Sequence, residues 1–270
     1  MKNILILTDF SDNSWNSISY ALDLFKDKTI NFFILKTLSK ENEYFNTEER
    51  VDANDNLDSL LNEIKNTSTN KKHTFNIIKE AKNIITATKA QLKENNIDLI
   101  IIGTNDLTSK NIKNNNHISE ELITKVPCDI MVVPNTASYS GYNEVVFATE
   151  FTNFLEAKIT YDLRENTPFK NSKFSFLYLT KAEKPLNNDQ QWNKETLHDY
   201  FKNVSHSFSE KINNNLAVSL DDFVKEIKAD LIITAAKNLN LIEQLIFRPN
   251  SSNLNYTNKT PFLVLNQSTI

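Results

Sequence analysis

The most informative segment of this 270-residue chain reads Asp98-Leu99-Ile100-Ile101-Ile102-Gly103, and a close copy follows at Asp230-Leu231-Ile232-Ile233-Thr234-Ala235. Each copy places an acid before an apolar run, which is typical of a strand buried on both faces of a parallel sheet. At the same spacing, Ile130-Met131-Val132-Val133 is matched by Phe262-Leu263-Val264-Leu265. Two matches that share one spacing predict a repeated unit of domain size.

A third match lies near the start of each copy. Thr8-Asp9-Phe10-Ser11-Asp12 corresponds to Thr149-Glu150-Phe151-Thr152-Asn153, at a spacing of 141 instead of 132. The second copy is therefore expected to be shorter than the first. We place the loss near its third strand, for which residues 215–218 are a short and weakly apolar candidate.

Short apolar runs alternate with longer amphipathic segments along the first copy. Strands are expected at 4–7, 30–35, 74–78, 99–102 and 130–133, and helices at 15–25, 47–66, 80–95 and 119–125. This alternation predicts an α/β fold with a parallel sheet covered on both faces. The expected domains are residues 1–136 and 143–270, joined by a small, polar linker at 137–142 that contains Gly141.

Glycine is scarce, with only Gly103 and Gly141 in the whole chain against an average usage of about 7 per cent. A dinucleotide-binding G-x-G-x-x-G motif needs three glycines. A P-loop and a G-x-S-x-G nucleophile elbow each need two at close spacing. The two glycines lie too far apart for either motif, so these three classes of site are excluded.

Composition narrows the remaining classes of function. A net charge of −4 and a pI of about 5.7 argue against a nucleic-acid partner. The single Cys128 fits a reducing compartment, and no apolar run reaches the length of a membrane helix. We expect a cytoplasmic protein with no membrane partner. The spacing of its histidines predicts no metal site, and Cys128 reads as a buried small residue.

Together with Thr8-Asp9-Phe10-Ser11 and Cys128-Asp129-Ile130-Met131-Val132-Val133-Pro134, the repeated segments resemble the universal stress protein family in its tandem, two-domain form. The resemblance implies two doubly wound α/β domains, each with a five-stranded parallel sheet flanked by helices. It also implies pairing through the last strand of each domain. In a tandem chain this pairing gives an internal pseudo-dimer, which can dimerise further into a homodimer.

Some members of that family bind ATP through G-x2-G-x9-G-[S/T] between the fourth strand and the fourth helix. Glycines there let the backbone approach the phosphates, and helix amides hold the anion. In this chain the four motif positions are Gly103, Asp106, Asn116 and His117. Only the first glycine remains, and Asp106 would repel phosphate. The second copy keeps no glycine at the corresponding positions.

The candidate nucleotide cleft lies at the carboxyl ends of the first domain's strands, where ligands bind in such folds. It comprises Asp9, Thr37, Gly103, Asn105, Asn116, His117 and Ser119. The resemblance implies that Asp9 and Thr37 meet adenine and ribose, and that the others meet phosphate. The alternative roles are structural: Asp9 shapes the turn into the first helix, Gly103 permits a tight turn, and Ser119 caps the fourth helix.

The expected function is a non-enzymatic stress-response module with a degraded nucleotide loop, acting through a protein partner or a small ligand and needing no cofactor. A small ligand in the first domain would be cationic or hydroxylated if Asp106 selects it. The alternative is an adenine-nucleotide-binding protein that binds ATP in the first domain alone, with slow hydrolysis.

Overall fold

The structure of the chain is a computed structural model, which describes residues 2–37, 47–104, 115–152, 169, 171–236 and 259–266. For residues 47–56 and 115–117 only the backbone is described. The described residues divide into two compact units, the first ending at Tyr139 and the second starting at Ser140. Each unit is an α/β sandwich built on its own parallel strands.

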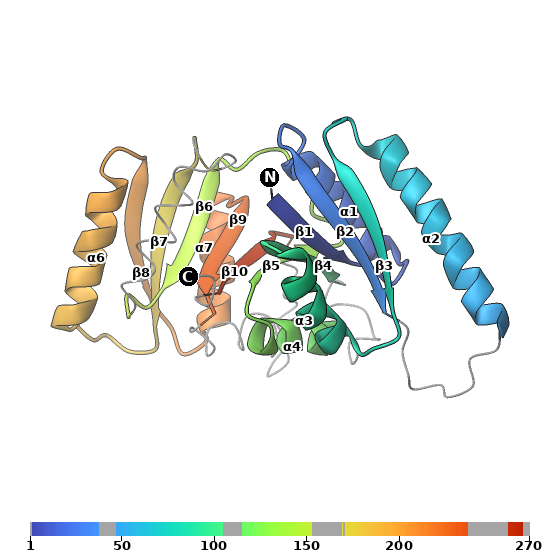
Figure 1. Cartoon of the computed structure of the whole chain (residues 1–270). Helices are drawn as coiled ribbons and strands as arrows, with labels where there is room; N and C mark the ends of the chain where they lie inside the picture. The colour runs from blue at the N-terminus through green and yellow to red at the C-terminus, as the bar shows by residue number, and fades with distance from the viewer. Residues whose placement is uncertain are drawn as a thin grey trace. The chain divides into compact units, whose positions relative to one another are not determined.

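The first unit has five parallel strands in the order β3-β2-β1-β4-β5 (Figure 1). The strands are β1 (Lys2–Leu7), β2 (Ile30–Thr37), β3 (Thr74–Glu80), β4 (Leu99–Thr104) and β5 (Asp129–Pro134). The helices are α1 (Asp12–Leu24), α2 (Thr47–Thr67), α3 (Ile84–Asn95) and α4 (Asn115–Lys125). Helices α1 and α2 contact each other on one face of the sheet, and α3 and α4 contact each other on the opposite face.

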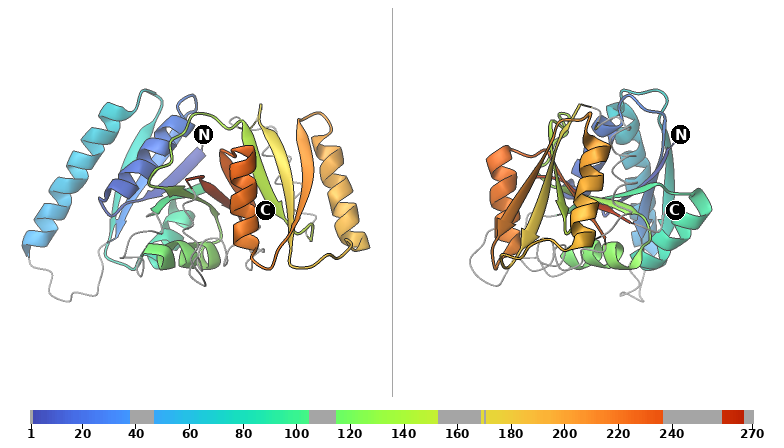
Figure 2. Two further views of the ribbon diagram at one scale, coloured as in Figure 1. Left: turned by 180° about the vertical axis from the view of Figure 1, so that it is seen from behind. Right: turned by 90° about the vertical axis from the view of Figure 1, so that its left-hand side faces the viewer.

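The second unit repeats this order as β8-β7-β6-β9-β10, again with all strands parallel. Its strands are β6 (Glu144–Thr149), β7 (Lys173–Thr180), β8 (His206–Ile212), β9 (Leu231–Ala235) and β10 (Phe262–Leu265). Its described helices are α6 (Asn188–Phe201) and α7 (Leu216–Ile227), which cover opposite faces (Figure 2). On β8, Phe208 faces the α6 side and Lys211 reaches Phe223 of α7, as the alternation of strand side chains requires.

The two units share details as well as strand order. Asp98 accepts a hydrogen bond from the amide of Asn3 (2.7 Å). Asp230 does the same for the amides of Asn143 (2.7 Å) and Glu144 (3.0 Å). In each unit the carboxylate therefore ties the start of the fourth strand to the start of the first. The predicted tandem α/β fold with two five-stranded parallel sheets is confirmed.

Buried aliphatic side chains dominate the core of both units, and the second unit buries more aromatic rings than the first. Ile4, Leu5 and Ile6 on β1 are fully buried, as continuous apolar central strands should be. In the second unit, Phe176 packs against Phe201 of α6, with ring centroids 5.0 Å apart. The cores bury the sheet faces and leave the carboxyl ends of the strands for the candidate site.

The predicted third strand of the second copy was wrong. Residues 215–218 hold the N-cap and the first turn of α7, where the Asn215 side chain accepts a hydrogen bond from the amide of Val218 (3.3 Å). The third strand is β8, whose alternating polar residues hide it from a search for apolar runs. The second copy is shorter than the first in part because its helix α6 has 14 residues, whereas the corresponding helix α2 of the first unit has 21.

The residues of the predicted linker, 137–142, pack within the units to which they belong. Ala137 is buried, and its carbonyl accepts a hydrogen bond from the Asn16 side chain (3.0 Å). Tyr139 makes an edge contact with Tyr20 of α1 at 5.8 Å. Tyr142 stacks on Phe169 at 5.2 Å. The chain therefore changes units over a short segment around Ser140.

None of the helices in the described part of the chain is both long and apolar enough to cross a lipid bilayer.

Candidate functional site

The carboxyl ends of β2, β1 and β4 lie side by side in the first unit, since β1 pairs with both neighbours. This arrangement brings Asp9, Thr37 and Gly103 to one edge of the sheet. Thr37 is the last residue of β2 and pairs with Glu80 of β3. The edge lies at the switch in strand order, where open α/β sheets bind ligands.

Asp9 is engaged in the turn that starts α1. Its carboxylate accepts hydrogen bonds from the amide of Ser11 (3.0 Å) and from the Ser11 hydroxyl. Ser11 is the N-cap of α1, and its hydroxyl accepts a hydrogen bond from the amide of Ser14 (3.3 Å). Partial burial acts to raise the pKa of Asp9, but the hydrogen bonds from Ser11 and the charge of Lys36 outweigh it and lower that pKa. Ser11 thus caps α1, and Asp9 holds Ser11 in place, which is the structural role expected for Asp9 in the turn.

Lys36 and Phe10 belong to the same edge, and the sequence did not single them out. The Lys36 ammonium lies 4.8 Å from the centroid of the Phe10 ring. Burial lowers the pKa of Lys36, and the nearby Asp9 carboxylate opposes this shift. Phe10 has a left-handed backbone with φ of 69°. No sequence signal could have found this group, because its members approach one another only through the pairing of β1 with β2.

Gly103 lies where β4 passes against the first turn of α1. A Cβ atom added at this position would be 2.3 Å from the carbonyl oxygen of Asn13 and 2.8 Å from its carbonyl carbon. Backbone atoms at such distances cannot accommodate a side chain. Close packing of a strand against a helix therefore accounts for the one glycine left at the motif positions.

The phosphate end of the candidate cleft is described only in part. Asn105 lies outside the described residues. Asn116 and His117 lie in the first turn of α4, whose amides have no partner within the helix itself. Ser119 does not cap α4, because the helix begins at Asn115; its side chain is instead buried, with no hydrogen-bond partner for its hydroxyl among the described residues.

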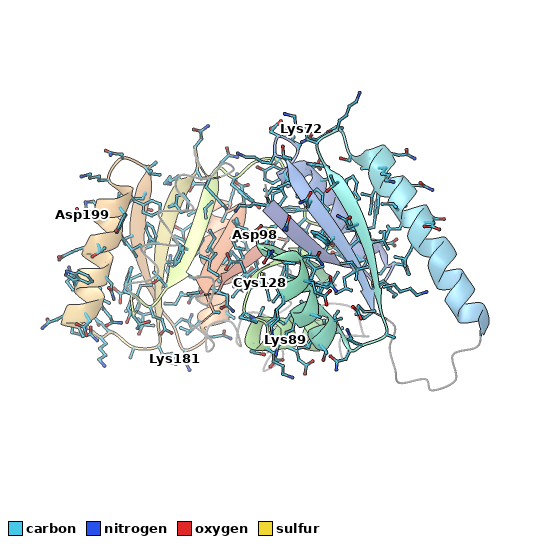
Figure 3. All side chains as sticks on the ribbon, viewed as in Figure 1. Lys72, Lys89, Asp98, Cys128, Lys181 and Asp199 are labelled. Atoms are coloured by element: carbon cyan, nitrogen blue, oxygen red, sulfur yellow. The ribbon has the colours of Figure 1, made fainter. Side chains whose placement is uncertain are left out.

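The second unit has a described cavity at the corresponding edge of its sheet. Its volume is about 370 Å³, and Lys181 at its rim is labelled in Figure 3. The carbonyl oxygen of Glu150, the repeat of Asp9, accepts a hydrogen bond from the Gln190 side chain (2.9 Å). The cavity is lined by Glu150, Tyr178, Leu179, Thr180, Lys181, Gln190 and Leu216. Sequence reasoning missed it, because its walls come from four separate segments.

Cys128 is a buried free cysteine. The thiol is buried just before β5 (Figure 3) and lies 3.7 Å from the carbonyl oxygen of Ile97. Burial, with the charges of Asp129 and Asp98, raises its pKa to about 12, so the reactive thiolate is absent near neutral pH. Among the described residues, no group of three or more histidine, cysteine or acidic side chains is arranged to hold a metal ion.

Comparisons with known proteins agree with this architecture. The model of the Universal stress protein family matches residues 1–134. No curated protein matches the chain by sequence. A solved universal stress protein from Archaeoglobus fulgidus has a TM-score of 0.72 at 12% identity, with 98% of this chain and 96% of that chain covered.

Two other solved structures share the fold over the whole chain. A functionally unknown protein from Pseudomonas aeruginosa has a TM-score of 0.55 at 10% identity, with coverage of 98% of this chain and 92% of that one. The cytoplasmic domain of a prokaryotic cation chloride cotransporter has a TM-score of 0.52 at 11% identity, with coverage of 99% and 96%. At these identities the likeness concerns the fold alone.

Proposed function

Since this chain belongs to the universal stress protein family through its residues 1–134, we propose that it is a non-enzymatic stress-response module that acts by binding a protein partner or a small ligand. The nucleotide loop of its first domain has degraded, and the second domain keeps none of the motif's glycines. Binding, rather than turnover, is the activity that these residues support.

The contact between Gly103 and Asn13 carries this proposal. The first motif glycine has a packing role, because the Asn13 carbonyl leaves no room for a Cβ atom. Asp9, the acid at the adenine end, has its carboxylate engaged by Ser11 in starting α1. Both surviving features of the nucleotide cleft are therefore explained by folding, without a bound nucleotide.

The remaining motif positions argue in the same direction. Asp106 and Asn116 replace glycines that would let the backbone approach phosphate, and Asp106 adds a repelling charge. The high pKa of the Cys128 thiol removes the chain's only cysteine as a nucleophile. These features support a protein that neither requires ATP nor catalyses a reaction.

One observation favours adenine-nucleotide binding in the first unit as the second candidate. Asn116 and His117 stand in the first turn of α4, and the amides of a helix N-terminus hold anions. A nucleotide bound there would use the altered loop at its phosphate end and Asp9 and Thr37 at its base. Slow hydrolysis would be an extension of this activity.

The test is isothermal titration of the purified full chain with ATP and Mg²⁺, after mass spectrometry has confirmed that no nucleotide co-purified. We expect no heat of binding. A dissociation constant near 1 μM, equivalent to about −8 kcal/mol, would overturn the proposal and establish the second candidate.

A double variant, Asp106→Gly with Asn116→Gly, tests whether the motif is correctly placed. Restored glycines should create ATP binding if loss of backbone access abolished it. The matched control is Asp106→Ala with Asn116→Ala, which removes the charge and the amide without restoring the backbone freedom of glycine. Equal behaviour of the two double variants would contradict the assignment of these positions.

A further inference from the structure

Two histidines of the second unit face each other, one from helix α6 and the other from strand β8. His198 lies in the last turn of α6, next to Asp199, which Figure 3 labels on that helix. His206 is the first residue of β8. His198 Nδ1 and His206 Nε2 are 2.9 Å apart. Spacing along the chain could not reveal this pair, because His198 and His206 belong to different elements.

The hydrogen-bond partners define how the pair carries its protons. His206 Nδ1 lies 2.8 Å from the carbonyl oxygen of Val204, which can only accept, so this nitrogen carries a hydrogen. A neutral His206 therefore presents the lone pair of Nε2 toward His198. In this arrangement His198 donates the hydrogen on its Nδ1 to His206 Nε2. When a metal ion takes the place of this hydrogen, the proton can move to Nε2 of His198.

The contact between His206 and Val204 is the one that holds metal-binding histidines in proteins. A ligating imidazole usually donates its second N–H to a carbonyl or carboxylate, which fixes the ring and strengthens the ligand. The His206 ring is held further by an edge contact with Phe208, with centroids 5.7 Å apart. The exposed His198 can rotate, so one ligand is fixed in place and the other adjusts to the ion.

The separation of the two nitrogens suits a metal ion with right-angled ligands. Two nitrogens at about 2.0 Å from an ion and at 90° to each other lie about 2.8 Å apart, whereas a tetrahedral ion needs about 3.3 Å. The observed 2.9 Å is an ordinary hydrogen-bond length, and it is close enough to the first value that replacing this bond with such an ion moves the two nitrogens little. Tetragonal geometry with nitrogen ligands is characteristic of Cu²⁺ and Ni²⁺, and Cu²⁺ binds most tightly among divalent first-row ions.

His73 in the first unit supplies an internal comparison. It precedes β3 as His206 begins β8, but both of its nitrogens have protein partners. Nδ1 lies 2.9 Å from the Ser68 hydroxyl, and Nε2 lies 3.1 Å from the carbonyl oxygen of Phe25. Neither partner is a second imidazole, so the pair of facing imidazoles belongs to the second unit.

Charges near the pair set the strength that we expect. Lys194 is one helical turn before His198 on α6, and its ammonium lies 5.5 Å from the centroid of the Phe208 ring. This positive charge opposes a cation, and Asp199 beside His198 offsets part of it. Among the described residues only these two imidazoles are placed to bind the ion, so water fills its other positions and the site exchanges its ion with solvent.

We propose that His198 and His206 form a two-histidine chelating site for a late first-row divalent metal ion, with Cu²⁺ bound more tightly than Zn²⁺. The ion replaces the hydrogen bond between the rings, binding Nε2 of His206 and Nδ1 of His198. The displaced proton moves to the exposed nitrogen of His198, and two water molecules leave the ion. Metal binding thereby ties the end of α6 to the start of β8.

The experiment uses the full chain without an affinity tag, titrated calorimetrically with CuCl₂ at neutral pH in the presence of glycine as a competing chelator. We expect one equivalent to bind. His198→Gln and His206→Gln should each weaken binding about 100-fold, because either change removes the chelate. His117→Gln is the matched control and should bind like the wild type. Wild-type affinity in His198→Gln would overturn the proposal.

A second measurement keeps the proposal falsifiable if His206→Gln disturbs the strand. Nitrogen NMR of the imidazole rings in the wild-type chain should show that substoichiometric Cu²⁺ broadens His198 and His206 first. The His73 signals should stay sharp. Broadening that begins at His73 or His117 would contradict the assigned site, as would tighter binding of Zn²⁺ than of Cu²⁺.

Discussion

Gly103 shows how a motif residue can be retained for packing alone. The Asn13 carbonyl lies where a Cβ atom would be, so the first turn of α1 fits against β4 only if this position is glycine. The family's motif and the demands of the fold coincide at this residue. Its presence alone therefore says nothing about phosphate binding.

Gly103→Ala should lower the free energy of unfolding by about 1–3 kcal/mol, because the new methyl group forces α1 away from β4. Gly141→Ala is the comparison. Nothing lies within 4 Å of a Cβ atom there, and its φ of 106° costs only local strain. Urea unfolding monitored by circular dichroism measures both. An unchanged free energy of unfolding for Gly103→Ala would contradict the close packing, whereas any loss at Gly141 reports backbone strain alone.

Asp9 should make stability depend on pH in the acid range. Its pKa lies below the ordinary 3.8, since the Ser11 hydrogen bonds and Lys36 outweigh the effect of burial. A carboxylate with a depressed pKa stabilises the folded state above its unfolded-state pKa. That contribution is lost as the pH falls through the folded-state pKa.

Asp9→Asn should therefore be less stable than the wild type at pH 6. The difference between the two proteins should shrink as the pH falls below 3.8. Thermal unfolding across this range measures it. Asp12 is an exposed residue in the first turn of α1, and Asp12→Asn serves as the control for the loss of one negative charge. A difference between Asp9→Asn and wild type that does not change with pH would refute the assigned role.

At the scale of elements, Asp98 and Asp230 hold equivalent strand ends. Removing either carboxylate leaves backbone amides of the first strand without their acceptor. Asp98 accepts from one amide and Asp230 from two. Because hydrogen bonds to charged groups contribute about 1.5–3 kcal/mol, Asp230→Ala should destabilise the chain more than Asp98→Ala.

Chemical unfolding of the two alanine variants and of the double variant tests this order. The sites lie in different units, so their effects should add when each is read from the transition of its own unit. Asp98→Asn and Asp230→Asn retain an acceptor oxygen and should recover part of the loss. A larger loss for Asp98→Ala than for Asp230→Ala would contradict the hydrogen-bond difference.

The elements that the sequence predicts best are those buried on both faces. Central strands such as β4 and β9 are continuous apolar runs, and their type and place were predicted correctly. The edge strand β8 was missed, because half of its side chains face water and polar residues alternate along it. Helix α4 begins at Asn115, before its expected start, because the periodic pattern there is weak.

The same distinction applies to the candidate site: residues next to apolar strands could be located from the sequence, and contacts between separate elements could not. Asp9, Thr37 and Gly103 lie at one sheet edge, because each follows or ends a strand that the apolar pattern reveals. The contact of Lys36 with Phe10 and the pairing of His198 with His206 could not be predicted. These contacts depend on register and on helix position, which spacing along the chain does not encode.

At the scale of the whole molecule, the chain contains two units whose strands have the same order. Taken alone, each unit's sheet has two outer strands, and one of them is the last strand of its domain, β5 or β10. The family resemblance implies pairing through these strands. An unpaired edge with apolar neighbours recruits another strand.

We therefore expect residues 1–139, expressed alone, to self-associate. Light scattering after size-exclusion chromatography measures the mass of this fragment, with residues 140–270 and the full chain analysed in parallel. Circular dichroism establishes whether each fragment is folded. Two monomeric, soluble and folded fragments would contradict an internal pseudo-dimer.

The scarcity of glycine also affects the unfolded chain. Left-handed turns in the described residues are made by Phe10, Asn96, Phe151 and Lys228 as well as by Gly141. Side chains at these positions restrict the unfolded backbone far more than glycine would. The chain therefore surrenders less conformational entropy when it folds, while each left-handed side chain adds local strain to the native state. A less disordered starting ensemble therefore adds to the stability that the buried sheets supply.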